Sequence, residues 1–253
     1  MRRWDIAVAS DTGQVRSSNE DYYCHFQTTT ATLLAVADGM GGCADGALAS
    51  TIAIHTLSQH FRNALRGSNS VVAWESVLRE AFLDANEEIM RTALERQGEL
   101  GMGTTLTALV ITQKGIICAH CGDSRLYRVR GGRFEQLTAD HSLVGEMVRK
   151  GGLTEEEARA HPQRNVLTNA LGTQAGPRVD LASDLLWPED NFLLCTDGLI
   201  NALSPAEIAE LILAEKGNGA QSLAYQLVSM ANARGGPDNI TVVVALWPDR
   251  GRW

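Results

Sequence analysis

Short runs of apolar residues recur along the chain, and Gly, Asp or Asn stands at the boundaries of most of them. Runs of this length that are rich in Val, Ile, Leu and Thr are typical of β-strands, and such boundary residues are typical of turns. Strands are therefore predicted over residues 5–9, 22–27, 32–37, 104–112, 115–121, 125–130, 192–196 and 240–247. Several of them follow one another after short turns, as the strands of antiparallel hairpins do.

Longer stretches repeat apolar residues every three or four positions, which is the period of an amphipathic helix. Helices are predicted over 44–65, 74–97, 141–150 and 221–233, and capping-box patterns at Thr154 and Ser204 begin two more. The two longest lie together between the third and fourth predicted strands. Because strands come in hairpin-like runs and helices in pairs, the pattern favours an α+β fold with antiparallel sheets over a doubly wound parallel sheet.

The chain has 253 residues, of which 44% are hydrophobic and 21% are charged, as in globular proteins that bury a sizeable core. No linker or repeat is evident, so we expect one domain over residues 1–253. The net charge of −8 argues against nucleic acid or an anionic membrane as the main partner. No apolar run reaches the length of about 18 residues that a membrane span needs, and the N-terminus does not resemble a signal peptide. The 5 cysteines show no disulfide-framework spacing, so we expect a reduced, cytoplasmic protein.

Cys118 and Cys121, with His120 beside them, raise the question of a zinc or redox site. A zinc site of this kind needs a second pair of ligands, and the sequence has none. Residues three apart in a strand face opposite sides and lie about 10 Å apart, too far for a disulfide. We therefore expect two buried strand residues.

Carboxylates stand next to turn residues where predicted strands begin or end. Asp38 and Asp197 each follow a strand and precede a glycine, Asp123 lies between two strands, and Asp238 directly precedes the last strand. Each alone is a common turn residue. Together they can converge at one edge of a sheet, where carboxylates without ammonium partners repel one another unless a cation joins them. Ligand sets made only of oxygen favour Mg²⁺ or Mn²⁺ over Zn²⁺.

Six short motifs occur in a fixed order over residues 13–244. They are Arg16–Asp21 (RSSNED), Ala37–Gly42 (ADGMGG), Gly103–Thr105 (GTT), Gly122–Arg125 (GDSR), Thr196–Gly198 (TDG) and Asp238–Asn239 (DN). In this order they resemble the bacterial members of the metal-dependent type 2C serine/threonine protein phosphatases, the PPM family. The resemblance implies a four-layer α-β-β-α sandwich of two mainly antiparallel sheets flanked by helices, with a small flap and a two-metal centre in a cleft.

The resemblance also implies the ligands of the metal centre. Matched position by position, Asp38 bridges two Mn²⁺ or Mg²⁺ ions. The carbonyl of Gly39 binds one ion, and Asp197 and Asp238 bind the other. Bacterial relatives often bind a third ion, and Asp123 matches the carboxylate that holds it together with Asp197.

Two further residues match the parts of the family site that handle water and phosphate. Glu20 resembles the residue that holds a metal-bound water, and Arg16 resembles the arginine that binds the substrate phosphate through its planar fork of donors. Two ions about 3.5–4 Å apart clamp phosphoryl oxygens and acidify a bridging water, so the implied nucleophile is a metal-bound hydroxide. Many eukaryotic relatives carry a histidine, a candidate general acid for the leaving group, at the position of Met40, and bacterial relatives commonly carry a histidine at the position of Cys43. This chain has an imidazole at neither position, so no general acid is assigned.

Residues 139–173 correspond to the flap beside the cleft in bacterial relatives. The segment holds the predicted helix 141–150, the Gly151-Gly152 pair and the capped helix that begins at Thr154. Where relatives often carry an arginine, this chain has Asn169. Two interpretations stand, a flap that tunes substrate choice and a plain surface excursion.

The main hypothesis is a protein serine/threonine phosphatase that removes phosphate from phosphoserine and phosphothreonine and reverses a serine/threonine kinase in bacterial signalling. The alternatives are a non-catalytic member that docks phosphoproteins and a phosphatase of a small phosphorylated metabolite. A degenerate docking member is expected to lose a metal carboxylate, and Asp38, Asp197 and Asp238 are all present. We expect phosphorylated proteins and a cognate kinase as partners, and a monomer.

Overall fold

The computed structural model describes residues 3–41, 43–66, 73–97, 101–173, 176–214 and 217–247. Two five-stranded sheets lie face to face, with strand orders β1-β12-β11-β8-β9 and β10-β7-β6-β3-β2, and every pairing within them is antiparallel. The strands are β1 Asp5–Asp11, β2 Tyr22–Gln27, β3 Ala31–Ala37, β6 Leu106–Thr112, β7 Ile116–Cys121, β8 Arg125–Arg130, β9 Arg133–Gln136, β10 Asp180–Asp184, β11 Asn191–Cys195 and β12 Ile240–Leu246. A further short pair joins β4 Gly39–Met40 to β5 Gly103–Thr104.

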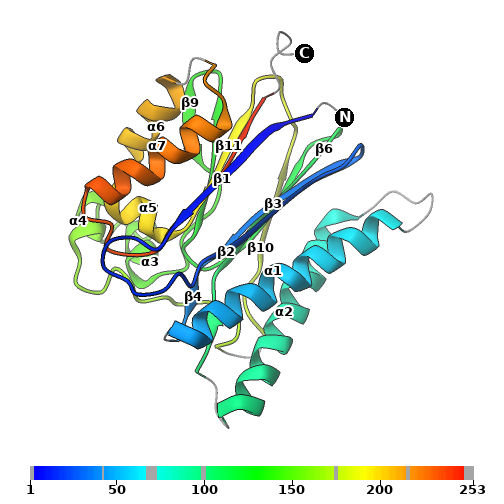
Figure 1. The fold of residues 1–253 in the computed structure, drawn as a ribbon, viewed down its shortest axis with the longest axis vertical. Coiled ribbons are helices and arrows are strands. Elements are labelled where there is room, and N and C mark those ends of the chain that lie inside the picture. Colours follow the sequence, from blue (N-terminus) through cyan, green and yellow to red (C-terminus); the bar gives the residue numbers. More distant parts are fainter. Residues whose placement is uncertain are drawn as a thin grey trace.

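Helices cover the outer faces of the two sheets (Figure 1). They are α1 Cys43–Arg66, α2 Trp74–Gln97, α3 Leu143–Arg149, α4 Glu155–Ala160, α5 Asp197–Ala202, α6 Pro205–Ala214 and α7 Ala220–Ala233. The long pair α1 and α2 packs on the sheet that contains β3, whereas α5, α6 and α7 pack on the sheet that contains β12. The α+β prediction and its four layers are therefore confirmed.

Alternation along the strands explains why three apolar layers form between the four structural layers. In β3, Leu33 and Ala35 pack toward α1 and α2, whereas Leu34 and Val36 pack between the sheets. The cysteines obey the same rule, since Cys118 lies in the layer between the sheets and Cys121 in the layer under the helices. Both are buried and free, as the spacing predicted.

The sequence misplaced several boundaries near the end of the sheets where the motifs meet. The strand predicted over 104–112 is interrupted at Thr105, because the Thr105 N–H donates to the Asp38 carbonyl at 2.9 Å instead of continuing the ladder. Asp197, which was expected to follow a strand in a simple turn, is the first residue of α5. The helix predicted over 141–150 begins at Leu143, capped by Ser142, whose hydroxyl accepts the Gly145 N–H.

The two capping boxes predicted from sequence are present. Thr154 and Glu157 cap each other at the start of α4, and Ser204 and Glu207 do the same at the start of α6. Over the described part of the chain, no helix has the length and apolar character required to span a membrane.

Candidate metal centre

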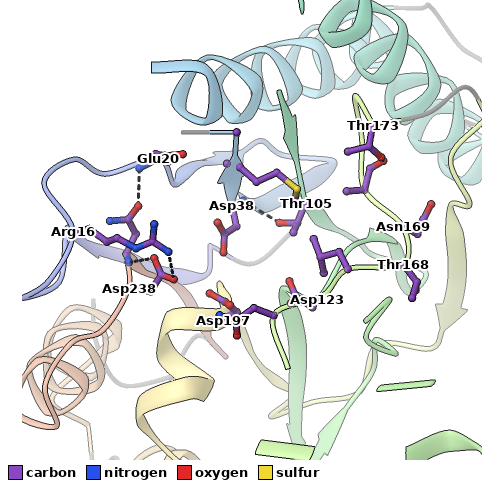
Figure 2. A pocket seen from close by; sticks show the side chains of 17 residues that line it. Arg16, Glu20, Asp38, Thr105, Asp123, Thr168, Asn169, Thr173, Asp197 and Asp238 are labelled. Carbon is purple, nitrogen blue, oxygen red and sulfur yellow. Dashed lines mark hydrogen bonds and ion pairs between the residues drawn. The ribbon is translucent and has the colours of Figure 1, made fainter. Parts of the chain in front are cut away.

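A cavity of about 610 Å³ lies where loops from both sheets meet. All the site residues predicted from the sequence line it, namely Arg16, Glu20, Asp38, Gly39, Asp123, Asp197 and Asp238. Figure 2 shows Asp38, Asp123 and Asp197 in its middle, Arg16, Glu20 and Asp238 on one side, and Thr168, Asn169 and Thr173 on the other. Segments more than 200 residues apart in the chain therefore meet in one cavity, as the motifs predicted.

Asp38 is held in place by the backbone and hydroxyls of the Gly103–Thr105 motif. Its N–H donates to Thr105 Oγ1 at 2.9 Å, and its carbonyl accepts the Thr105 N–H and the Thr104 hydroxyl at 2.9 and 2.8 Å. Thr105 is itself hydrogen-bonded to Ser124 at 2.8 Å. This network explains why the Gly-Thr-Thr motif accompanies the aspartate, since both hydroxyls are needed to fix its backbone.

Gly39 and Gly46 allow α1 to lie directly against the loop that carries Asp38. A Cβ on Gly39 would stand 2.2 Å from the Gly46 carbonyl oxygen, and a Cβ on Gly46 would stand 1.9 Å from Oε2 of Glu20. The Gly39 N–H also donates to the Glu20 carbonyl at 3.2 Å. Glu20, Gly39 and Gly46 thus pack without room for a methyl group, which sets the position of the Glu20 carboxylate.

A single amide side chain joins the last motif to the first. Asn239 Oδ1 accepts the Glu20 N–H at 2.8 Å, and Asn239 Nδ2 donates to the carbonyls of Thr12 and Ser18 at 2.9 Å. Arg16, on the segment held in this way, forms an ion pair with Asp238 at 2.8 Å. The predicted phosphate-binding arginine is therefore placed beside a predicted metal ligand, and its side chain is 51% exposed.

Burial and mutual repulsion raise the pKa values of the clustered carboxylates. The pKa of Asp38 lies well above its usual value because of burial and of the neighbouring Asp21 and Asp197. Burial is also the main cause that raises the pKa values of Asp123 and Asp197, and each is raised further by another aspartate. A divalent cation relieves this repulsion, so the cluster is suited to bind one.

Oxygen atoms without partners support the same conclusion. Oδ1 of Asp197 is buried and accepts no hydrogen bond, while its Oδ2 accepts the Asn201 amide at 3.1 Å. In the described residues, no three side chains of His, Cys, Asp or Glu are grouped closely enough to enclose an ion by themselves. Mg²⁺ usually keeps several waters and takes one or two carboxylates. The residues therefore fit hard, partly hydrated ions, and the donor set does not fit zinc.

Asp21 is a buried acid whose place at the site the sequence did not reveal. Its Oδ2 accepts a hydrogen bond at 2.8 Å from the hydroxyl of Thr196, the residue that precedes Asp197. Its Oδ1 is buried and has no hydrogen-bond partner within the described residues. Burial raises its pKa to about 7. The carboxylate lies behind the cavity, and the signal that could have revealed it was its place beside Glu20 in the first motif.

Residues from the predicted flap form the far wall of the cavity. Thr168, Asn169 and Thr173 lie there (Figure 2). The Asn169 amide is bonded to the Arg178 backbone in both directions, at 2.8 and 3.0 Å. Asn169 thus braces this wall at the position where relatives often carry an arginine.

No histidine is among the described residues that line the cavity. Met40 does line it, and the side chain of Cys43 lies outside the described part of the structure. His141, which follows Asp140 at the start of the predicted flap, is buried away from the cavity and its Nε2 lies 3.0 Å from Asp180. The leaving-group acid therefore stays unassigned.

Comparison with known proteins decides the family. The profile described as protein phosphatase 2C matches residues 13–227. The chain belongs to the protein phosphatase 2C family. It is 36% identical over 247 residues to protein phosphatase PhpP of Streptococcus pneumoniae, covering 95% of this chain and 96% of that protein.

Solved structures of this family have the same fold. The Mycobacterium tuberculosis serine/threonine phosphatase PstP/Ppp aligns with a TM-score of 0.84 and 34% identity, covering 97% of this chain and 99% of that one. The catalytic domain of the phosphatase PstP in complex with two manganese ions aligns with a TM-score of 0.82 and 33% identity, covering 97% and 99%. The resemblance inferred from the motifs is confirmed, and the relatives support the phosphatase hypothesis rather than its alternatives.

Proposed function

We propose that this protein phosphatase 2C family member removes phosphate from phosphoserine and phosphothreonine in proteins, using divalent metal ions. The observation that carries the proposal is the convergence of Asp38, Asp123, Asp197 and Asp238 with Arg16 in one cavity. Relatives named as serine/threonine phosphatases over nearly the whole chain support the substrate class. The phosphate removed is one that a serine/threonine kinase adds, so we propose such a kinase as the cognate partner, with the phosphatase acting as a monomer in the cytoplasm.

The carboxylates and one carbonyl would hold the ions. Asp38 would be shared by two ions, the Gly39 carbonyl would serve one of them, and Asp197 and Asp238 would serve the other. Asp123 and Asp197 would be available to a third. Mn²⁺ and Mg²⁺ both suit this oxygen donor set. Bound ions of this kind supply charge to the phosphoryl oxygens and lower the pKa of water.

The protein's own groups bind and orient the phosphate. Arg16 offers a planar pair of donors, and its partner Asp238 holds the guanidinium at the rim of the cavity. The guanidinium of Arg16 is half exposed at this place, so it would be available to a phosphate dianion that enters the cavity. Glu20 lies beside Arg16, and burial raises the pKa of the Glu20 carboxyl group. We assign to Glu20 the placement of a water molecule, because its carboxylate is fixed against Gly46.

Hydrolysis of a phosphothreonine peptide, followed by release of inorganic phosphate, tests the proposal. Turnover is expected with Mn²⁺ and not with EDTA, and Asp38→Asn is expected to reduce kcat by about a thousandfold, since it removes a ligand shared by both ions. Asp84→Asn, an exposed aspartate of α2 paired with His60, is the matched control and keeps full activity. Metal-replete, folded protein without turnover would refute the proposal.

A further inference from the structure

A second cavity of about 290 Å³ adjoins the metal centre. Asp123 and Asp197 line both cavities, so the two meet at these carboxylates. The walls of the second cavity come largely from α3, α4 and α5 and from the segment between β9 and α3. A peptide whose phosphate lies in the first cavity therefore has a second depression next to it.

Arginines outnumber acidic residues among the charged side chains that line the second cavity, when the two aspartates that it shares with the metal centre are left aside. The charge of Arg125 is balanced by Asp140, whose carboxylate accepts three hydrogen bonds from the Arg125 guanidinium at 2.7, 2.9 and 3.1 Å. With Asp123 and Asp197 assigned to the metal ions, the remaining charged lining residues are Arg149, Arg159 and Arg164 against Glu155.

Arg159 and Arg164 differ from the arginines that form ion pairs within the described residues. Across the described residues, neither guanidinium has a hydrogen-bond or ion-pair partner, and both side chains are exposed. Ion pairs do engage Arg16, Arg91, Arg96, Arg125, Arg128, Arg130, Arg178 and Arg234. In an acidic protein, two unpaired arginines at the rim of one cavity are positioned for an anion that arrives from outside.

The floor of the second cavity is apolar. Val144, Ala158 and Ile200 line it and are 7%, 8% and 9% exposed. An apolar floor with arginines at the rim suits a peptide segment that carries an acidic side chain beside an aliphatic one. A small inorganic anion would leave this floor uncovered.

We propose that the second cavity is a substrate subsite that binds a carboxylate or a second phosphate next to the phosphoresidue, through Arg159 and Arg164. The proposal rests on the phosphatase function and names its substrate class, phosphoproteins with acidic or multiply phosphorylated sequences. The arginines are exposed, so their contribution to specificity is modest and decreases with ionic strength.

Peptide series with one phosphothreonine provide the test. Every peptide keeps the phosphothreonine, and one flanking position at a time is varied. That position carries Glu in the first series, phosphoserine in the second and Ala in the third. The quantity measured is the ratio of kcat/KM for the acidic peptide to that for the Ala peptide. At the best position we expect a ratio of about ten in low salt, falling toward one in Arg159→Gln/Arg164→Gln. Arg79→Gln, which changes an exposed arginine of α2, keeps the ratio of the unmodified protein.

Charge reversal extends the test. Arg159→Glu/Arg164→Glu should favour a Lys peptide over the Glu peptide, which a merely structural role of the two arginines would not produce. The Glu and phosphoserine series show which anion the cavity prefers. A ratio near one at every position in the unmodified protein, or a ratio unchanged in both double variants, overturns the subsite.

The failure of this proposal is separable from failure of the phosphatase function. Fluorescence anisotropy of the same labelled peptides reports binding whether or not turnover occurs. Turnover without acidic preference overturns the subsite alone, whereas absence of turnover overturns the phosphatase function. In the second case, weaker binding of the acidic peptide to Arg159→Gln/Arg164→Gln still supports the subsite, and equal binding overturns it.

Discussion

The two adjoining cavities share Asp123 and Asp197 but are built in different ways. The metal centre draws its residues from motifs spread from Arg16 to Asn239, and hydrogen bonds tie several of these motifs to one another. The second cavity is formed mainly by residues 136–164, with two arginines that have no partner within the described structure. Hydrogen bonds between separate motifs thus hold residues of the first cavity in place, whereas the two arginines of the second cavity are not held in this way.

In the functions proposed above, the first cavity carries out the hydrolysis and the second contributes to the choice of substrate, so a change in one cavity should affect the protein differently from a change in the other. A change at the metal centre disturbs several motifs together, because Asp38, Thr105 and Asn239 each contact another motif. A change at Arg159 or Arg164 alters a charge at the rim and removes no side-chain hydrogen bond or ion pair within the described residues. Substrate preference can therefore vary among related chains while the metal centre stays fixed.

The largest expected effect concerns the stability of the metal-free protein as a function of pH. Burial raises the pKa of Asp21 from its ordinary value of 3.8 to about 7 in the folded protein, so folding favours its protonated form. The contribution of Asp21 to the stability is therefore largest below pH 4 and is lost as the pH rises through 7, by on the order of 2–4 kcal/mol. Asp38, Asp123 and Asp197, whose pKa values are also raised, act in the same direction.

Thermal unfolding with EDTA and with Mn²⁺, at several pH values, measures this effect. The pKa of His120 is lowered to about 4 by burial and by His141, so this residue removes stability as the pH falls below 6.5. Since that contribution is present with and without metal, the difference between the two series isolates the carboxylates. A gap in Tm between the two series that widens with rising pH is expected, and a constant gap would contradict the electrostatic description of the metal centre.

The fold was largely predictable because most strands carry their own pattern. Residues 22–27 and 125–130 were predicted with the observed boundaries, since turn residues flank an apolar or aromatic run. The missed strands β9 and β10 lie at sheet edges and are mostly exposed, so their sequences lack that pattern. The helix α5 was hidden because Asp197-Gly198 has the composition of a turn.

The cavity that gathers the candidate metal ligands was predictable for a different reason. Its residues stand at strand ends in motifs that resemble a known family, so the sequence order alone indicated their convergence. The buried Asp21 and the second cavity were not predictable, because each depends on packing between elements. Arg159 and Arg164 have no sequence pattern that distinguishes them from any exposed arginine until α3, α4 and α5 are placed together.

An intermediate effect is expected from Gly46→Ala. The added methyl would lie 1.9 Å from Oε2 of Glu20 and 2.9 Å from the Gly39 carbonyl carbon, so the Glu20 carboxylate must move. We expect kcat to fall by about 10- to 100-fold, with about 1–3 kcal/mol of lost stability. Gly152→Ala is the matched control, because its methyl would meet only the Met147 carbonyl at 3.5 Å. Full activity in Gly46→Ala would show that the metal centre is less constrained than its packing indicates.

The smallest expected effect distinguishes the paired arginine of the metal centre from the unpaired arginines beside it. Arg16→Lys keeps the positive charge but replaces a planar fork by a point charge, so phosphate binding should weaken. We expect kcat/KM to fall by about tenfold, mostly through KM, and equally for p-nitrophenyl phosphate and for every phosphopeptide. Loss of the second-cavity arginines should instead change the ratio between peptides. If Arg16→Lys altered that ratio while sparing p-nitrophenyl phosphate, Arg16 would serve peptide recognition, and the division between the two cavities would be wrong.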